Sequence, residues 1–431
     1  MKRLTLLNIF ILSCTTVFAQ QANPELKGLI NKSFSYYPAF NELNQAIQVE
    51  ADRVSLTQAS RNPTLDATGS YRYIHPVSKI TIPTGNAQPL AFQIMPNHNY
   101  STTLNASYVL WDFGKVKTDV DRAKTALQYA RDNVDYNKNQ MAYQVASIYY
   151  EIIYLEKAIA IQDSVLNFLN ANKKDTEVKL KHGDALRYDV LSIQSTVDQA
   201  QNAKIDLQNS LKKQINLLQY TTGVENCGGA DFDFTLPDMA DANNALSSAQ
   251  SNNVEFKLLK DRIAQAEAAL AVSRQGGKPS LVANAGTGFT NGYTPQIDRF
   301  KYNYSAGVTL SIPIYEGGRN KRQVRLSQSQ LKETSYGLAT LNNDYLKNIK
   351  QALADIESNR NSIVNAERQV AEAKQAQQLA QSRYKNGTGT NLELTNASTN
   401  VQTVSLTQLR YQFQLCQANL ELARLTGIAY W

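Results

Sequence analysis

The sequence of 431 residues predicts a mainly α-helical chain with a membrane β-barrel contribution, built from a duplicated unit of two strands and a long helical hairpin. Two observations support this fold class. From Lys115 to Thr222 there is no proline and only one glycine, Gly183, so the residues that break helices are missing from both limbs. Four stretches of about ten residues alternate apolar and polar side chains with the period of two that marks a β-strand.

The N-terminus predicts a secretory signal peptide in residues 1–19. Lys2 and Arg3 precede an apolar run that ends at Val17-Phe18-Ala19, which is the order of a basic region, a hydrophobic region and a small-residue cleavage site. The run is shorter than the ~20 residues of a spanning helix, so a membrane anchor is the weaker interpretation. Cys14 offers a lipidation site as an alternative, which the hydrophobic residues after it disfavour.

The first strand pair follows two short helices. Residues 20–61 predict helices separated at Pro38, and Asn62-Pro63 ends the second, because the residue before a proline is pushed out of the α region. Residues 62–111 predict a membrane β-hairpin with strands at 65–73 and 100–110. The intervening loop is expected to have no regular structure, since it contains Pro76, Pro83, Gly85, Pro89 and Pro96.

Residues 112–223 predict the first long helical hairpin, with its tip near Gly183. Apolar residues from Val116 to Ile159 alternate spacings of three and four, close to the 3.5-residue period of a coiled coil. At ~1.5 Å per residue, residues 115–182 would span roughly 100 Å, so we expect other helices to sheathe this one. An ordinary amphipathic helix is the alternative, which the length of the pattern disfavours.

The same order then recurs. Residues 224–277 predict an irregular equatorial segment and one helix from about 242 to 273. Residues 278–314 predict a second membrane β-hairpin with strands at 281–289 and 302–312. Residues 315–431 predict a second long helical hairpin with its tip near Gly387.

Glycines at matching places show that the two halves are copies. A single offset of 204 positions relates Gly114 to Gly318, Gly183 to Gly387, and Gly223 to Gly427. Agreement of several anchors in one register indicates internal duplication. The offset between Pro63 and Pro279 is 216, so we expect the first strand loop to be about twelve residues longer than the second.

Each predicted strand has the length and alternation of a transmembrane barrel strand. Lipid requires every backbone polar group to be paired, and the smallest membrane barrels have eight strands, so four strands cannot close alone. Two copies would give eight strands and three would give twelve. A soluble sheet is the alternative, but it leaves a polar face along all four strands unexplained. The aromatic side chains that we expect to form an interfacial belt are Tyr71, Tyr73, Tyr100, Tyr108, Trp111, Tyr302 and Tyr304.

Other functional classes have little support in the sequence. The net charge of +7 is spread along the chain without a dense basic cluster, so no nucleic acid is expected as a partner. His75, His98 and His182 have no partner at metal-ligand spacing, and no nucleotide, hydrolase or metalloprotease motif occurs. We therefore expect no enzyme, no cofactor and no metal. Cys227 and Cys416 are expected to be free buried thiols, with a disulfide as the alternative.

The duplicated unit resembles the TolC-type outer-membrane efflux proteins of Gram-negative bacteria over essentially the whole mature chain. The resemblance implies a homotrimer with a twelve-stranded barrel in the outer-membrane lipid and an α-helical barrel across the periplasm. It also implies an exit duct for a tripartite efflux or type I secretion system, partnered by a periplasmic adaptor protein and an inner-membrane RND or ABC pump. A secreted trimeric coiled-coil adhesin is the alternative. The motifs that carry the resemblance are Asn62-Pro63 and Lys278-Pro279, Trp111-Asp112-Phe113-Gly114 and Tyr315-Glu316-Gly317-Gly318, and the turns at 181–191 and 384–394.

By this resemblance both turns lie at a periplasmic tip that constricts the duct and docks the adaptor. The family's gate positions correspond to Asp189, Glu393 and Tyr384. Gly389 and Asn396 stand where well-known members have an arginine and an acidic residue, so we expect the polar contacts at the tip to differ from those of these members. The alternative for both acidic residues is a favourable contact with a helix macrodipole. The expected docking residues are Gly183, Asp184, Lys385, Gly387 and Thr388.

Overall fold

The computed structural model describes residues 23–85, 87–225, 227–229, 231–236 and 241–431. The predicted signal peptide, with Cys14, lies outside the described residues. The chain divides into two compact units, which are described separately below. The strand unit comprises Asn41–Asp135 and Glu255–Leu341, and the helical unit comprises Met1–Phe40, Tyr136–Val254 and Asn342–Trp431.

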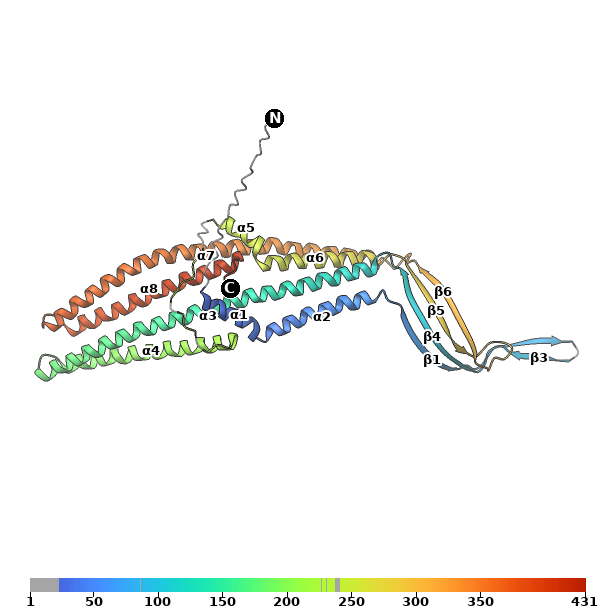
Figure 1. Ribbon diagram of the computed structural model, residues 1–431, viewed down its shortest axis with the longest axis horizontal. Helices are drawn as coiled ribbons and strands as arrows, with labels where there is room; N and C mark the ends of the chain where they lie inside the picture. The colour runs from blue at the N-terminus through green and yellow to red at the C-terminus, as the bar shows by residue number, and fades with distance from the viewer. Residues whose placement is uncertain (1–22, 86, 226, 230, 237–240) are drawn as a thin grey trace, which may run out of the picture. The chain divides into compact units, whose positions relative to one another are not determined.

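The strand unit is built on a four-stranded antiparallel sheet, which confirms the four predicted strands (Figure 1). The spatial order is β1-β4-β5-β6, so consecutive hairpins lie side by side and β1 and β6 are the edges. Neither edge pairs with another strand among the described residues. The strands are β1 (Thr64–Tyr73), β4 (His98–Trp111), β5 (Ser280–Thr290) and β6 (Lys301–Ser311).

The two faces of this sheet differ in chemistry. Tyr71 lies opposite Tyr100, Thr102 opposite Phe289, and Phe289 opposite Tyr302, so the aromatic side chains of all four strands share one face. The other face is polar: Thr68 Oγ1 and Thr103 Oγ1 are 2.8 Å apart, and Asn284 Nδ2 donates to Thr309 Oγ1. All seven predicted belt residues are exposed, from 40% for Tyr100 to 79% for Tyr304.

The loop between β1 and β4 is not irregular, and that prediction was wrong. It contains a second antiparallel pair, β2 (Lys79–Thr84) and β3 (Ala87–Gln93), drawn in Figure 1 beyond the ends of β1 and β4. Neither Pro83 nor Pro89 is among the residues paired in register, and the register shifts between Ile82 and Thr84. A two-stranded ribbon consists only of edge strands, which tolerate prolines at a bulge.

The change from strand to helix is made by the two predicted junction motifs. Asp112 accepts hydrogen bonds from the backbone N–H of Gly114 at 2.9 Å and of Val116 at 2.6 Å, which caps the helix that follows. Phe113 and Gly114 have φ of 56° and 88°, so the chain reverses through the left-handed region. In the second copy Gly317 and Gly318 have φ of 64° and 74°. The helices that enter this unit are α2 (Ala39–Ala59), α3 (Lys115–His182), α6 (Val254–Gln275) and α7 (Arg319–Lys385).

The helical unit contains the distal parts of both long hairpins. The limits of α3 are those that the absence of glycine and proline predicts, and the core is built on its side chains, among them Tyr149, Tyr150 and Leu169. Figure 1 shows α3 and α7 folding back into α4 and α8. The remaining helices of this unit are α1 (Pro24–Tyr36), α4 (Arg187–Thr222), α5 (Ala242–Asn252) and α8 (Asn391–Thr426).

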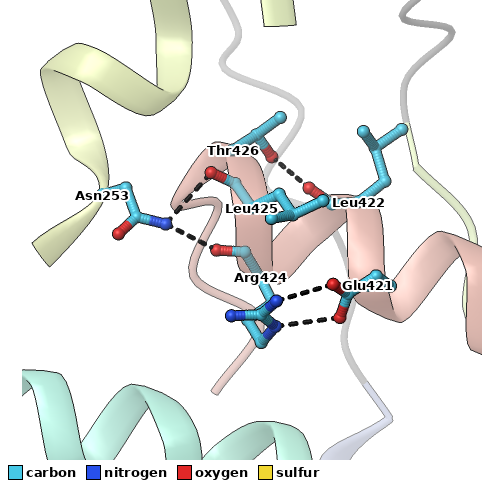
Figure 2. Close-up of polar contacts among 6 residues, drawn as sticks. All are labelled: Asn253, Glu421, Leu422, Arg424, Leu425 and Thr426. Atoms are coloured by element: carbon cyan, nitrogen blue, oxygen red, sulfur yellow. Dashed lines mark hydrogen bonds and ion pairs between the residues drawn. The ribbon is translucent and has the colours of Figure 1, made fainter. Parts of the chain in front are cut away.

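The helix predicted from 242 to 273 is two helices, α5 and α6, because Asn253 leaves the helical conformation with φ −76° and ψ 129°. Figure 2 shows the reason: Asn253 Nδ2 donates to the carbonyl oxygens of Arg424 and Leu425 at 2.8 and 3.0 Å. These carbonyls belong to the last turn of α8, where no intrahelical N–H remains to bond them. A long-range contact, which the local sequence does not reveal, therefore breaks the helix.

The described part of segment 224–241 is irregular, as predicted, and polar contacts hold it to α3. Tyr150 Oη donates to Asp233 Oδ1 at 2.8 Å, and Lys157 Nζ donates to Asp231 Oδ1 at 2.9 Å. Both cysteines of the described chain are free thiols; Cys416 is buried and Cys227 is half-buried, so burial of the second is less complete than predicted. Burial raises the pKa of the Cys227 thiol to about 11.

Candidate functional site at the helical turns

Both turns reverse the chain through a left-handed glycine. Gly183 has φ 85° and Gly387 has φ 74°, and a Cβ added at either position would meet no atom within 4 Å. The glycines are needed for their backbone conformation and not for space. The N–H of Asp184 donates to Lys179 O and that of Thr388 to Arg383 O, each at 2.9 Å, so the two turns close in the same way.

Asp189 caps the first turn. Its Oδ2 accepts a hydrogen bond at 2.9 Å from the backbone N–H of Leu186, the residue that precedes α4. This is the reach of an N3 carboxylate back to the N-cap, and the helix macrodipole favours a negative charge there. The geometry therefore supports the alternative interpretation of Asp189, that of a capping residue.

Glu393 occupies the matching N3 position of α8 but makes different contacts. Its N–H donates to Thr390 Oγ1 at 3.2 Å, and its Oε2 lies 3.5 Å from Arg383 Nη1. Both charged side chains are about half exposed, so the ion pair contributes little to stability. Arg383 thus supplies a positive charge to the second turn, although Gly389 stands at the position where well-known family members have an arginine.

Tyr384 is buried, with 7% of its surface exposed, and it joins the second hairpin to α3. Its Oη lies 2.7 Å from Thr176 Oγ1. Lys179 Nζ donates to the carbonyl oxygen of Tyr384 at 2.6 Å and lies 4.1 Å from the centre of its ring. Burial raises the pKa of Tyr384 above its usual value, and the negative charge of Asp189 acts in the same direction.

A second contact between the hairpins lies beside Tyr384. Asn391, the first residue of α8, is 6% exposed. Its Oδ1 accepts from Asn172 Nδ2 at 3.1 Å, and its Nδ2 donates to the carbonyl oxygen of Asp189 at 3.4 Å. The structure therefore brings Asp189 and Tyr384 into one neighbourhood through Asn172, Thr176 and Asn391.

The predicted docking residues Gly183, Asp184, Lys385, Gly387 and Thr388 are all exposed. Large apolar side chains next to the first turn are exposed as well: 68% for Leu186, 74% for Tyr188 and 59% for Leu191. The sequence reasoning missed this apolar group and also the partners of Tyr384. Four apolar residues among the six at 186–191 were a signal for the former. Thr176 and Lys179 lie more than 200 positions from Tyr384 and carry no local signal.

The strand unit has a charged cluster of its own, built around the buried Asp132. Lys257 Nζ on α6 lies 2.7 Å from Asp132 Oδ1 on α3, and Gln128 Nε2 donates to Asp132 Oδ2 at 3.0 Å. Burial works to raise the pKa of Asp132, but the bonds from Lys257 and Gln128 outweigh it and lower the pKa. Burial, and then the neighbouring Asp132, raise the pKa of Asp261 to about 6. The ion pair between Lys257 and Asp132 ties α3 to α6.

Neither a metal site nor a spanning helix is found within the described ranges. No group of three or more His, Cys, Asp or Glu side chains could hold a metal ion there. None of the helices in the same residues has the length and hydropathy to cross a membrane.

A protomer in which two strand pairs with a polar face alternate with two long helical hairpins has the architecture of an outer-membrane channel subunit. The model of the outer membrane efflux protein family matches residues 29–224 and 245–428. The chain is 22% identical to outer membrane efflux protein BepC of Brucella suis over 436 residues, which cover 97% of this chain and 88% of BepC. The solved structure of the outer membrane protein VceC from Vibrio cholerae matches with a TM-score of 0.75 and 18% identity, covering 94% of this chain and 97% of VceC. The MtrE outer membrane channel of Neisseria gonorrhoeae, in its open state, matches with a TM-score of 0.75 and 17% identity over 94% of this chain and 89% of MtrE.

The chain belongs to the outer membrane efflux protein family. Its place is the outer membrane, with an extension into the periplasm, and its function is efflux transport. The family comprises transport proteins and not enzymes, and the adhesin alternative is set aside.

Proposed function

We propose that this chain is one of three identical subunits of an outer-membrane exit duct, which receives substrates from an inner-membrane RND or ABC pump through a periplasmic adaptor protein. The three sheets form a twelve-stranded barrel, and the helical hairpins continue it as an α-helical barrel. The tyrosine-bearing face of each sheet meets the membrane and the polar face lines the lumen.

The observation that carries this proposal is the two-faced sheet with two open edges. Tyr71, Tyr100 and Tyr302 share one face, and Thr68, Thr103 and Asn284 share the other. Lipid tolerates no unpaired strand edge, so β1 of one copy must pair with β6 of the next. Copies of a four-stranded sheet reach the smallest known barrel size only in groups of two or more, and relatives in this family are trimeric.

We assign the tip of the duct to the two turns. Asp189 and Glu393 of three copies bring six carboxylates to one neck, which favours cations and resists full closure by like-charge repulsion. Tyr384 and its bonds to α3 hold the hairpins together in the described conformation. The adaptor docks on exposed residues of both turns: Gly183, Asp184, Lys385, Gly387 and Thr388.

Single-channel conductance in a planar bilayer tests the duct. Purified full-length protein is expected to run as a trimer and to open discrete, long-lived pores. A trimer that inserts into the bilayer without conducting would overturn the duct and return the adhesin to consideration.

The neck is tested by selectivity. The double variant Asp189→Ala with Glu393→Ala should lower the ratio of cation to anion permeability in a reversal-potential measurement. Asp184→Ala is the matched control, because it removes an exposed carboxylate beside the turn and should leave the ratio unchanged. If the double variant and the wild type have the same permeability ratio, neither Asp189 nor Glu393 lines the neck.

A further inference from the structure

The ribbon formed by β2 and β3 carries an apolar face that is half exposed among the described residues of the strand unit. Ile80 lies opposite Phe92 and Ile82 opposite Leu90, so these four side chains share one side of the ribbon. We call them the apolar ribbon face. Each is about half exposed, between 49% and 51%. The other side carries Lys79, Thr81, Ala91 and Gln93.

The ribbon is a defined extension of the sheet. Ile74 N–H donates to Asn97 O at 2.8 Å, and Asn97 Nδ2 donates back to Ile74 O at 3.0 Å. Gln93 Nε2 donates to Met95 O and to Asn97 Oδ1, and Ile94 N–H donates to Ser78 O. These bonds fix the base of the ribbon on β1 and β4. Beyond its base, β2 and β3 pack mainly on each other.

A two-stranded ribbon is at best marginally stable in water, and a contiguous exposed apolar face usually marks an interface. We propose that the apolar ribbon faces of the copies in one assembly meet around its axis beyond the end of the sheet, so that each ribbon packs against the apolar ribbon face of a second copy of this chain. This inference rests on the proposed function, because it needs copies arranged side by side around one axis.

Position in the fold favours a second copy as the occupant. The ribbon is rooted on β1, which is an edge of the sheet and the strand that the neighbouring subunit must pair in the proposed barrel. The ribbon is therefore continuous with the seam between copies. Tethering to one assembly gives the ribbons a high effective concentration for one another, which a free partner lacks.

Charge also favours a second copy. From residue 79 to residue 95 the sequence contains one charged side chain, Lys79, and it lies on the side opposite the apolar ribbon face. Two copies can therefore meet through this face without bringing like charges together. An anionic lipid headgroup or a charged protein surface would find only a single cation on the ribbon.

Cysteine cross-linking on the full-length trimer tests the contact. In a background of Cys227→Ser and Cys416→Ser, Ile82→Cys should give a disulfide-linked dimer when outer membranes are treated with copper phenanthroline. Thr81→Cys is the matched control, because it is the adjacent residue on the opposite side of the ribbon. We expect about tenfold less cross-linking from the control, in keeping with an oriented contact at high effective concentration.

The outcomes separate this inference from the proposed function. If trimers and pores persist but Ile82→Cys fails to cross-link, or cross-links no better than Thr81→Cys, the ribbon contact alone is overturned. Loss of trimers or pores from the protein with its native ribbon would overturn the proposed function and the ribbon contact with it. A dye on Ile82→Cys that is quenched by nitroxide-labelled phospholipid in vesicles would show that lipid covers the face, and would also overturn the contact between copies.

Discussion

The two helical turns have the same backbone conformation, but the side chains that follow them differ in burial. Gly183 and Gly387 adopt the same left-handed conformation, and Asp189 and Glu393 both occupy N3 of the helix that follows. The first two turns of α8 are buried at four positions, with exposures of 1–8%. The matching stretch of α4 exposes large apolar side chains by 59–74%. The buried positions of α8 are Asn391, Leu394, Thr395 and Ser398. The exposed positions beside the first turn are Leu186, which precedes α4, and Tyr188 and Leu191 within α4; in α8 only Leu392 among the large apolar side chains of these turns is comparably exposed, at 64%.

Duplication has thus preserved the device that turns the chain while the surroundings of the two copies have diverged. In the second turn the side chains form the internal packing of the protomer, through Tyr384 and Asn391. In the first turn they remain available to another molecule. We therefore predict that substitutions of packed side chains in the second turn cost more stability than substitutions in the first, and the variants below test that difference.

The largest expected effect is that of Tyr384→Ala. Removing a buried aromatic side chain leaves a cavity and costs about 3–5 kcal/mol. Here it also deprives Thr176 of its hydrogen-bond partner and Lys179 of its contact with the ring, while the bond from Lys179 to the backbone carbonyl of residue 384 can persist. Amide hydrogen exchange of the peptides from the second turn should accelerate accordingly. Tyr188→Ala is the control, since its side chain is mostly exposed and its loss should leave exchange unchanged. If amide hydrogen exchange accelerates equally in Tyr384→Ala and Tyr188→Ala, the two turns do not differ in their contribution to stability.

Asn391→Ala should have the next largest effect. It removes the acceptor of Asn172 Nδ2 in a buried site, and a buried donor without a partner costs about 1–3 kcal/mol. Arg187→Ala alters the equivalent exposed position of α4 and should cost much less. Local opening free energies from hydrogen exchange would measure both. If Asn391→Ala proves as mild as Arg187→Ala, water must replace the lost amide and the site is less enclosed than its exposure indicates.

The sequence alone predicted the parts of the chain that local residue types control. The limits of α3 follow from the absence of glycine and proline, and both turns follow from a glycine at a fixed offset. The sequence-based prediction failed where contacts between residues far apart in the sequence determine the structure. Asn253 breaks a helix because it bonds the end of α8, and Tyr384 pairs with Thr176 across 208 positions. The ribbon of β2 and β3 was missed because its prolines were weighed more heavily than the alternation of Lys79-Ile80-Thr81-Ile82.

Alanine at either turn glycine tests the shared backbone. An L-residue with positive φ costs roughly 1–2 kcal/mol relative to glycine, and neither site has a neighbouring atom that would add a clash. Gly183→Ala and Gly387→Ala should therefore lower the local opening free energy of their own hairpins by equal amounts. Asparagine, which tolerates this conformation better, should restore part of the loss at both sites. If the two alanine variants lower the local opening free energy by different amounts, then the surroundings of Gly183 and Gly387 differ as well.

The smallest expected effects separate the two acidic residues. Asp189→Ala removes the carboxylate that accepts the Leu186 N–H and should cost about 1 kcal/mol in opening of the first turn of α4. Glu393→Ala removes only an exposed pair with Arg383, while Thr390 still caps the helix, so its cost should be within about 0.5 kcal/mol. Raising the salt concentration should diminish the Glu393 effect and leave most of the Asp189 effect, because a hydrogen bond to the backbone is screened far less than an exposed ion pair. An equal salt response would show that Asp189 acts by charge alone and that the two turns are more alike than their contacts indicate.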